Sequence, residues 1–150
     1  MRKIFTFYMV NHIEIHVYTD GASRNNPGQS AIGIVFLDGK GDLIAEHKEC
    51  IGITTNNRAE YLAIIRALEL GTEYCRKKVS IFSDSELVIN QLNSTYAIKS
   101  KELRDLYKQI KINEQFYQEV IYNWVSRKNK HICRADELCN PALEGHYTKK

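Results

Sequence analysis

Apolar and polar residues alternate over residues 13–19 of the 150-residue chain, and two further segments of strand character follow. Residues 13–19 predict a half-buried strand that ends at Asp20-Gly21. Residues 31–37 and 43–53 predict two more strands, and the turn sequence 38–41 (Asp-Gly-Lys-Gly) separates them. The opening of the chain therefore predicts an antiparallel meander.

The apolar spacing becomes helical at 56–70, where Gly71 stands at the position of a C-terminal cap. The later elements are expected at 79–83 (strand), 84–92 and 101–113 (helices), 119–125 (strand) and 134–143 (helix). This order predicts an α/β fold with a mixed five-stranded sheet, in which βαβ crossovers supply the parallel strands. The chain has no repeat or linker, so one domain is expected over residues 1–150.

The composition is that of a globular protein, with 43% hydrophobic and 26% charged residues. The net charge of +3 is too small to indicate a polyanionic partner. One loop gathers five basic residues, which belong either to a solvated surface or to a phosphate contact: Arg127, Lys128, Lys130, His131 and Arg134. The apolar run at residues 1–10 is too short for a secretory signal, and no segment has membrane-spanning length. A cytoplasmic protein with no obligatory protein partner is expected.

Four cysteines are scattered along the chain without a CxxC pair, which is typical of reduced thiols: Cys50, Cys75, Cys133 and Cys139. A zinc site built from Cys133, Cys139, His131 and His146 is an alternative, but these spacings match no common zinc pattern.

Four acidic residues are candidates for chemistry: Asp20, Glu60, Asp84 and Asp136. Each has a structural explanation of its own, because Asp-Gly favours a turn, Asn57 with Glu60 resembles a capping box, and the other two suit helix starts. Asp20 and Asp84 are expected at strand ends, and Glu60 and Asp136 in first helical turns, so the fold can bring all four to one side of the sheet. Such an all-oxygen cluster suits Mg²⁺ or Mn²⁺, and two ions of this kind support phosphodiester hydrolysis.

Five short motifs occur in a fixed order: YTDGA at 18–22, NNPG at 25–28, TTNNRAE at 54–60, SDS at 83–85 and ADEL at 135–138. Together they resemble the type 1 ribonuclease H family over residues 13–143. The TTNNRAE segment between TDGA and SDS carries most of this specificity. The resemblance implies the same strand and helix order and an enzyme that cuts the RNA strand of an RNA/DNA hybrid.

The family resemblance also implies roles for the four carboxylates and the ends of the product. Asp20 would bridge two metal ions, Asp136 would help to hold the ion that activates water, and Glu60 with Asp84 would hold the leaving-group ion. The expected products carry a 3′-hydroxyl and a 5′-phosphate. Glu60 is also expected near an RNA 2′-hydroxyl, the group that distinguishes RNA from DNA.

Short polar residues supply the expected substrate contacts: Asn25, Asn26, Thr55, Asn56 and Asn57. Such side chains suit a minor groove lined with hydroxyl groups. In the family, the positions that match Asn26 and 55–57 contact the hybrid backbone. The structural alternative, a turn at Asn26-Pro27 and a helix cap at Thr55 or Asn56, is compatible with binding.

His131 resembles the loop histidine that assists proton transfer or product release in many members of the family. The loop between Trp124 and Asp136 has only eleven residues, so the alternative is one more basic residue beside a phosphate. Residues 93–100 lack the basic protrusion of some members, Glu86 replaces a glutamine, and no N-terminal hybrid-binding domain is expected.

Two other functions are alternatives to the ribonuclease. A catalytically inactive hybrid-binding module would require a broken metal site, whereas all four carboxylates are present. A DNA-processing nuclease of the wider superfamily would share the acidic cluster but not the TTNNRAE segment.

Overall fold

The computed structural model describes residues 12–148, so the apolar run at 1–10 lies outside the described residues. The chain opens with three long strands, β1 (His12–Ser23), β2 (Gly28–Asp38) and β3 (Leu43–Thr54). They pair antiparallel in the order β3-β2-β1. This arrangement confirms the predicted meander.

Two more strands, β4 (Cys75–Ser83) and β5 (Glu119–Trp124), extend the sheet beyond β1. β4 pairs with β1, and β5 pairs with β4, both in parallel. The full order is β3-β2-β1-β4-β5, which confirms the predicted mixed five-stranded sheet. Parallel pairing brings the carboxyl ends of β1, β4 and β5 toward one edge of the sheet, where the candidate carboxylates lie.

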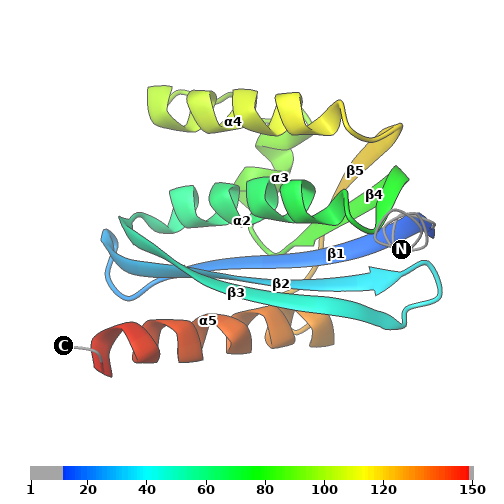
Figure 1. Ribbon diagram of the computed structural model, residues 1–150. Helices are drawn as coiled ribbons and strands as arrows, with labels where there is room; N and C mark the ends of the chain where they lie inside the picture. Colours follow the sequence, from blue (N-terminus) through cyan, green and yellow to red (C-terminus); the bar gives the residue numbers. More distant parts are fainter. Residues whose placement is uncertain (1–11, 149–150) are drawn as a thin grey trace.

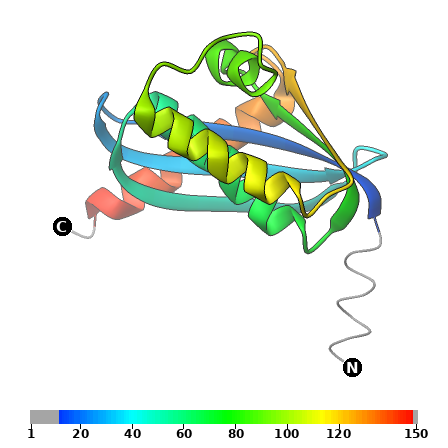
Figure 2. The ribbon, with the colours of Figure 1, turned by 90° about the horizontal axis from the view of Figure 1, so that it is seen from above.

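Helices cover both faces of this sheet. α2 (Asn56–Gly71), α3 (Glu86–Leu92) and α4 (Lys101–Glu114) lie on one face, and α5 (Lys130–Thr148) lies on the other (Figures 1 and 2). The larger apolar core fills the space between the sheet and α2, whereas a smaller cluster around Val35 and Ile132 joins the sheet to α5. The carboxylates therefore come from elements that are packed against each other.

Two predicted boundaries near the acidic residues were wrong. β1 does not end at Asp20 but continues to Ser23, and Asp20 pairs with Gly33 inside the sheet. Glu60 lies past the first turn of α2, whose N-terminal cap is Thr55: its hydroxyl accepts a hydrogen bond from the Arg58 backbone N–H at 3.3 Å. Thr55 thus confirms the capping alternative at this position.

The starts of two later helices also differ from the prediction. α3 begins at Glu86 rather than at Asp84, because the Ser85 hydroxyl caps it by accepting from the Val88 N–H. α5 begins at Lys130 rather than at residue 134 and continues to Thr148, so Asp136 lies in its second turn. As a result, Asp84 does not cap α3, and Asp136 does not lie in the first turn of α5, as the sequence allowed.

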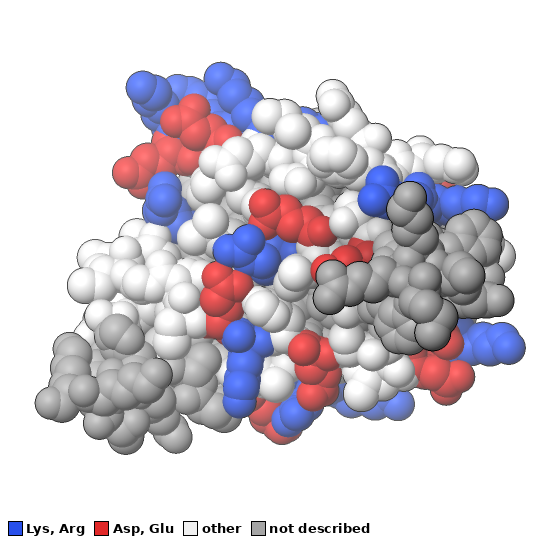
Figure 3. All heavy atoms as spheres, viewed as in Figure 1, with Lys and Arg blue, Asp and Glu red and all other residues white. Residues whose placement is uncertain are grey.

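Charge is mixed over the visible surface of the molecule. Lys and Arg side chains alternate with Asp and Glu side chains on the face seen in Figure 3. Within residues 12–148, no helix is long and apolar enough to cross a membrane.

Candidate active site

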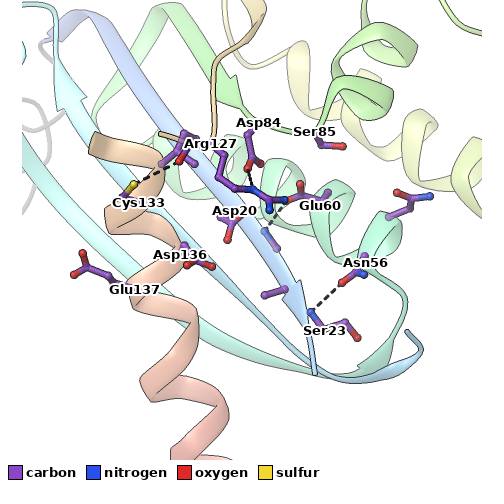
Figure 4. Close-up of a pocket in the computed structure, with 14 residues that line it drawn as sticks. Asp20, Ser23, Asn56, Glu60, Asp84, Ser85, Arg127, Cys133, Asp136 and Glu137 are labelled. Carbon is purple, nitrogen blue, oxygen red and sulfur yellow. Dashed lines mark hydrogen bonds and ion pairs between the residues drawn. The ribbon is translucent and has the colours of Figure 1, made fainter. Parts of the chain in front are cut away.

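Three of the predicted carboxylates meet beyond the carboxyl end of β4, beside the central strand β1. Oxygen atoms of Asp20, Glu60 and Asp84 all lie within 4.8 Å of one another. Asp136 approaches from α5 and lines the same cleft, whose volume is about 630 Å³ (Figure 4). The four acids come from β1, α2, the residue after β4, and α5, so the fold joins residues separated by up to 116 positions.

Glu60 is positioned by a close approach of α2 to β1. The Gly21 backbone N–H donates to Glu60 Oε1 at 2.6 Å. A Cβ atom at Gly21 would lie 2.4 Å from the Ala59 carbonyl carbon and 2.6 Å from the Glu60 nitrogen. Since real Cβ atoms do not approach backbone so closely, only glycine permits this contact. Gly21 thus serves helix packing rather than the turn that the Asp-Gly pair suggested.

A second glycine lets α5 approach the opposite face of the sheet. A Cβ atom at Gly33 would lie 2.0 Å from the Ala135 carbonyl oxygen. Ala135 is fully buried, and the next residue along the helix is Asp136. Because Gly33 pairs with Asp20 in the sheet, the same glycine brings Asp136 beside Asp20.

Asp84 lies between β4 and α3, where several groups restrain it. Its side chain is only 11% exposed, and Asp84 Oδ2 lies 3.5 Å from the Arg127 Nε atom. The Trp124 indole N–H donates to the Asp84 backbone oxygen at 3.2 Å. The Ser83 hydroxyl accepts from the Ser85 N–H, which fixes the backbone on either side of Asp84. These contacts hold the carboxylate toward the cleft.

Burial and mutual repulsion oppose ionisation of these acids. Desolvation raises the pKa of Asp20 well above its ordinary value, and the charges of Glu60, Asp84 and Asp136 raise it further. Desolvation likewise raises the pKa of Glu60, as does the charge of Asp84, whereas the Gly21 N–H and the Arg127 charge lower it. Such a cluster requires positive charge to stay fully ionised at neutral pH.

Two of the polar residues expected to bind substrate, Asn56 and Asn57, line the cleft. The Asn56 amide oxygen accepts from the Ser23 N–H at 3.1 Å (Figure 4). The Asn56 backbone N–H donates to the Asn26 amide oxygen at 2.9 Å. Asn25 and Asn26 are exposed in the loop after β1. Hydrogen bonds thus join Asn56, which lines the cleft, to Ser23 and Asn26. Residues 25–26 and 55–57 are called the polar rim below.

His131 is not among the residues that line the cleft. Its ring packs on Tyr18 with a centroid distance of 4.7 Å, and burial lowers its pKa. Its backbone N–H donates to the Asn129 side chain, which begins α5. The proton-transfer role of His131 stays a prediction.

Among the residues whose side chains the structure describes, the one cluster that could hold a metal ion consists of carboxylates. Cys133 is exposed and donates toward the Arg127 carbonyl, whereas Cys139 is buried and contacts the Asp20 carbonyl. Neither cysteine forms a disulfide. The His146 side chain lies outside the described part of the chain, so the structure gives the zinc alternative no support.

Arg127 and Trp124 are site residues whose roles the sequence reasoning missed. Arg127 reaches from the loop after β5 toward Asp84 and Glu60, although 91% of its side chain is exposed (Figure 4). The cluster of basic residues was the available signal for Arg127. For Trp124, the signal was a large aromatic residue at the carboxyl end of a strand.

The arrangement of strands and helices matches that of a known family of nucleases. The family model for RNase H matches residues 12–148 of the chain. The chain therefore belongs to the ribonuclease H family, which confirms the resemblance seen in the sequence motifs.

Several relatives and solved structures support this membership. The chain is 37% identical to ribonuclease HI of Halobacterium salinarum over 87% of its own length, and 33% identical to a ribonuclease H of Chlorobaculum parvum, also over 87%. It matches the crystal structure of the Halobacterium RNase H1 with a TM-score of 0.84 and 36% identity, over 88% of this chain and 98% of that one. LC11-RNase H1, which was crystallised with an RNA/DNA hybrid, matches with a TM-score of 0.81 and 36% identity, over 89% and 99%.

The coverage of these relatives differs. The chain spans 64% of the Halobacterium protein and 95% of the Chlorobaculum protein. It spans only 36% of a Mycobacterium tuberculosis protein named as bifunctional, Rv2228c, to which it is 31% identical over 88% of its own length. The match thus covers a ribonuclease H unit that also occurs within longer proteins.

Proposed function

We propose that this protein is a metal-dependent endoribonuclease that hydrolyses the RNA strand of RNA/DNA hybrids. The observation that carries this proposal is the cluster of Asp20, Glu60 and Asp84 oxygens within 4.8 Å, with Asp136 beside it. The named ribonucleases among its relatives and the hybrid bound to LC11-RNase H1 support it.

The carboxylate cluster fits hard divalent cations. Its donors are all oxygen atoms, which Mg²⁺ and Mn²⁺ prefer, and the raised pKa values of Asp20 and Glu60 reflect a local excess of negative charge. We assign the ligands to Asp20, Glu60, Asp84 and Asp136, with Mg²⁺ as the natural ion. Two bound ions would supply an activated water and stabilise the charge on the leaving oxygen.

The protein's own groups orient the substrate for this reaction. Gly21 and Gly33 fix the spacing of Glu60 and Asp136 around Asp20, and Arg127 adds a positive charge at the open side of the cleft. The polar rim at residues 25–26 and 55–57 is proposed to bind hybrid backbone and RNA 2′-hydroxyl groups. In the overall hydrolysis the bond between phosphorus and O3′ breaks, water gives its oxygen to phosphorus, and O3′ leaves as a hydroxyl group.

A substrate panel tests this proposal. End-labelled RNA/DNA hybrid, single-stranded RNA, duplex RNA and duplex DNA are incubated with Mg²⁺, with Mn²⁺ and with EDTA. We expect loss of only the RNA strand of the hybrid, and only with metal. Binding without cleavage would favour an inactive hybrid-binding module, and cleavage of duplex DNA would favour a DNA-processing nuclease.

His131 has a separate test, because its packing on Tyr18 offers a structural role besides proton transfer. A proton-transfer role predicts that His131→Ala lowers kcat by tenfold or more, as expected for a general acid or base. A packing role predicts a lower Tm with kcat retained. A cytoplasmic location stays a prediction from the sequence.

A further inference from the structure

Trp124 combines two features that the carboxylate chemistry leaves unused. It is the last residue of β5 and pairs with Ser83, the residue directly before Asp84. Its indole N–H donates a hydrogen bond to the Asp84 backbone carbonyl at 3.2 Å, yet 53% of the residue remains exposed. The polar edge of the ring is therefore fixed at the active site, while much of its apolar surface meets solvent.

The indole bond restrains the peptide that carries a proposed metal ligand. Asp84 belongs neither to β4 nor to α3, so its carbonyl lacks a partner from either element's regular pattern. Arg127 contacts the carboxylate of the same residue, which is thus held at both its backbone and its side chain. Trp124 is a positioning residue for Asp84.

The surroundings of the exposed ring resemble a protein surface that binds nucleic acid. Arg127, Lys128 and Lys130 follow within six residues, and all three are exposed. An exposed aromatic ring beside cations can contact a paired strand, because the ring packs on backbone sugars while the cations neutralise phosphates. A single exposed apolar residue is ordinary on a protein surface, but this one is tied to the active site by its hydrogen bond.

We propose that the exposed face of Trp124 contacts the nucleic-acid strand next to the scissile phosphate, while its N–H holds the Asp84 peptide. This inference rests on the proposed function, because it extends the substrate surface beyond the carboxylate cleft and the polar rim. It adds an aromatic contact to a chain that lacks the basic protrusion of some family members at residues 93–100.

The natural fluorescence of the protein provides a direct test, because Trp124 is the only tryptophan in the chain. Acrylamide quenching is measured on the Asp20→Asn variant alone, with Mg²⁺, and with saturating unlabelled RNA/DNA hybrid and Mg²⁺. Anisotropy of a labelled hybrid reports binding independently. We expect the hybrid to reduce the quenching constant at least twofold, whereas Mg²⁺ alone leaves it unchanged. When the hybrid is titrated, the quenching change should have the same midpoint as the anisotropy change.

Each result has a separate meaning. An unchanged quenching constant in a sample that anisotropy shows to be saturated would overturn the contact while leaving the proposed function intact. Failure of the hybrid to bind both this variant and the wild-type protein would overturn the proposed function itself, and the contact with it.

Kinetics of three variants separate the two roles of the ring. Trp124→Ala is expected to raise KM for the hybrid several-fold, because it removes the ring from the substrate surface. Trp124→Phe keeps a ring but loses the N–H, so kcat should fall more than KM rises. Phe116→Ala is the matched control, since Phe116 is 52% exposed and precedes the opposite end of β5. Equal KM values for Trp124→Ala and Phe116→Ala would refute the contact.

Discussion

Gly21→Ala tests how tightly the fold sets the geometry of the carboxylate site. The added Cβ would lie 2.4 Å from the Ala59 carbonyl carbon, about 1 Å closer than an ordinary van der Waals contact. All three nearest atoms belong to the backbone of α2, so no side-chain rotation relieves the clash. The helix must therefore move away from β1 and carry Glu60 with it.

The cost follows from this displacement. Overpacking of a tight contact destabilises a protein by about 1–3 kcal/mol. A shift of about 1 Å in a catalytic group lowers turnover by roughly 100-fold. We therefore expect Gly21→Ala to lower the free energy of unfolding by about 1–3 kcal/mol. We also expect it to lower kcat on a hybrid roughly 100-fold. Urea unfolding and initial-rate assays measure the two effects.

Gly39→Ala is a matched control at the other end of the same strand pair. A Cβ atom there would meet its nearest neighbour, Glu14 Cβ, at an ordinary 3.7 Å. This variant should retain both stability and turnover. If Gly21→Ala behaved like Gly39→Ala, the close approach of α2 to β1 would not set the position of Glu60.

Three further predictions concern charge and burial. Desolvation and neighbouring carboxylates raise the pKa of Asp20, so the folded protein holds a proton that the unfolded chain releases. The free energy of unfolding, measured in EDTA, should therefore fall as the pH rises above about 4. Asp20→Asn should weaken this fall and abolish turnover. Arg127→Ala should raise KM for the hybrid several-fold without changing Tm, because the side chain is 91% exposed; an unchanged KM would argue against a phosphate contact. Tyr61→Phe should cost about 1–3 kcal/mol in urea unfolding, because it removes the donor to the buried Gln91 amide oxygen at 2.6 Å; wild-type stability would show that Gln91 finds another partner.

The sequence pattern predicted the order of elements and the sheet because apolar periodicity reflects which faces are buried. It failed where a residue has two physical uses. Gly21 after Asp20 favours a turn, but here glycine lets α2 approach β1 inside a continuing strand. Gly71, expected as a cap, is the last residue of α2, and its missing side chain leaves room for the Tyr117 hydroxyl.

Helix starts were misplaced for a similar reason. Asn129 accepts from the N–H groups of His131 and Ile132, so α5 begins about one turn earlier than the apolar spacing indicated. The four carboxylates could be selected from motifs, whereas the contacts of Arg127 and Trp124 with Asp84 depend on tertiary geometry. Such contacts leave no periodic signal in the chain.

The chemistry of the cleaved ends tests the central claim most directly. A hybrid with a labelled RNA strand is cut in Mg²⁺ by the wild-type protein and by Asp84→Asn, and the RNA fragments are analysed by mass spectrometry. Hydrolysis by water at the carboxylate cluster predicts 3′-hydroxyl and 5′-phosphate ends from the wild type and intact RNA from the variant. Fragments ending in a 2′,3′-cyclic phosphate, or equal cleavage by Asp84→Asn, would contradict the account.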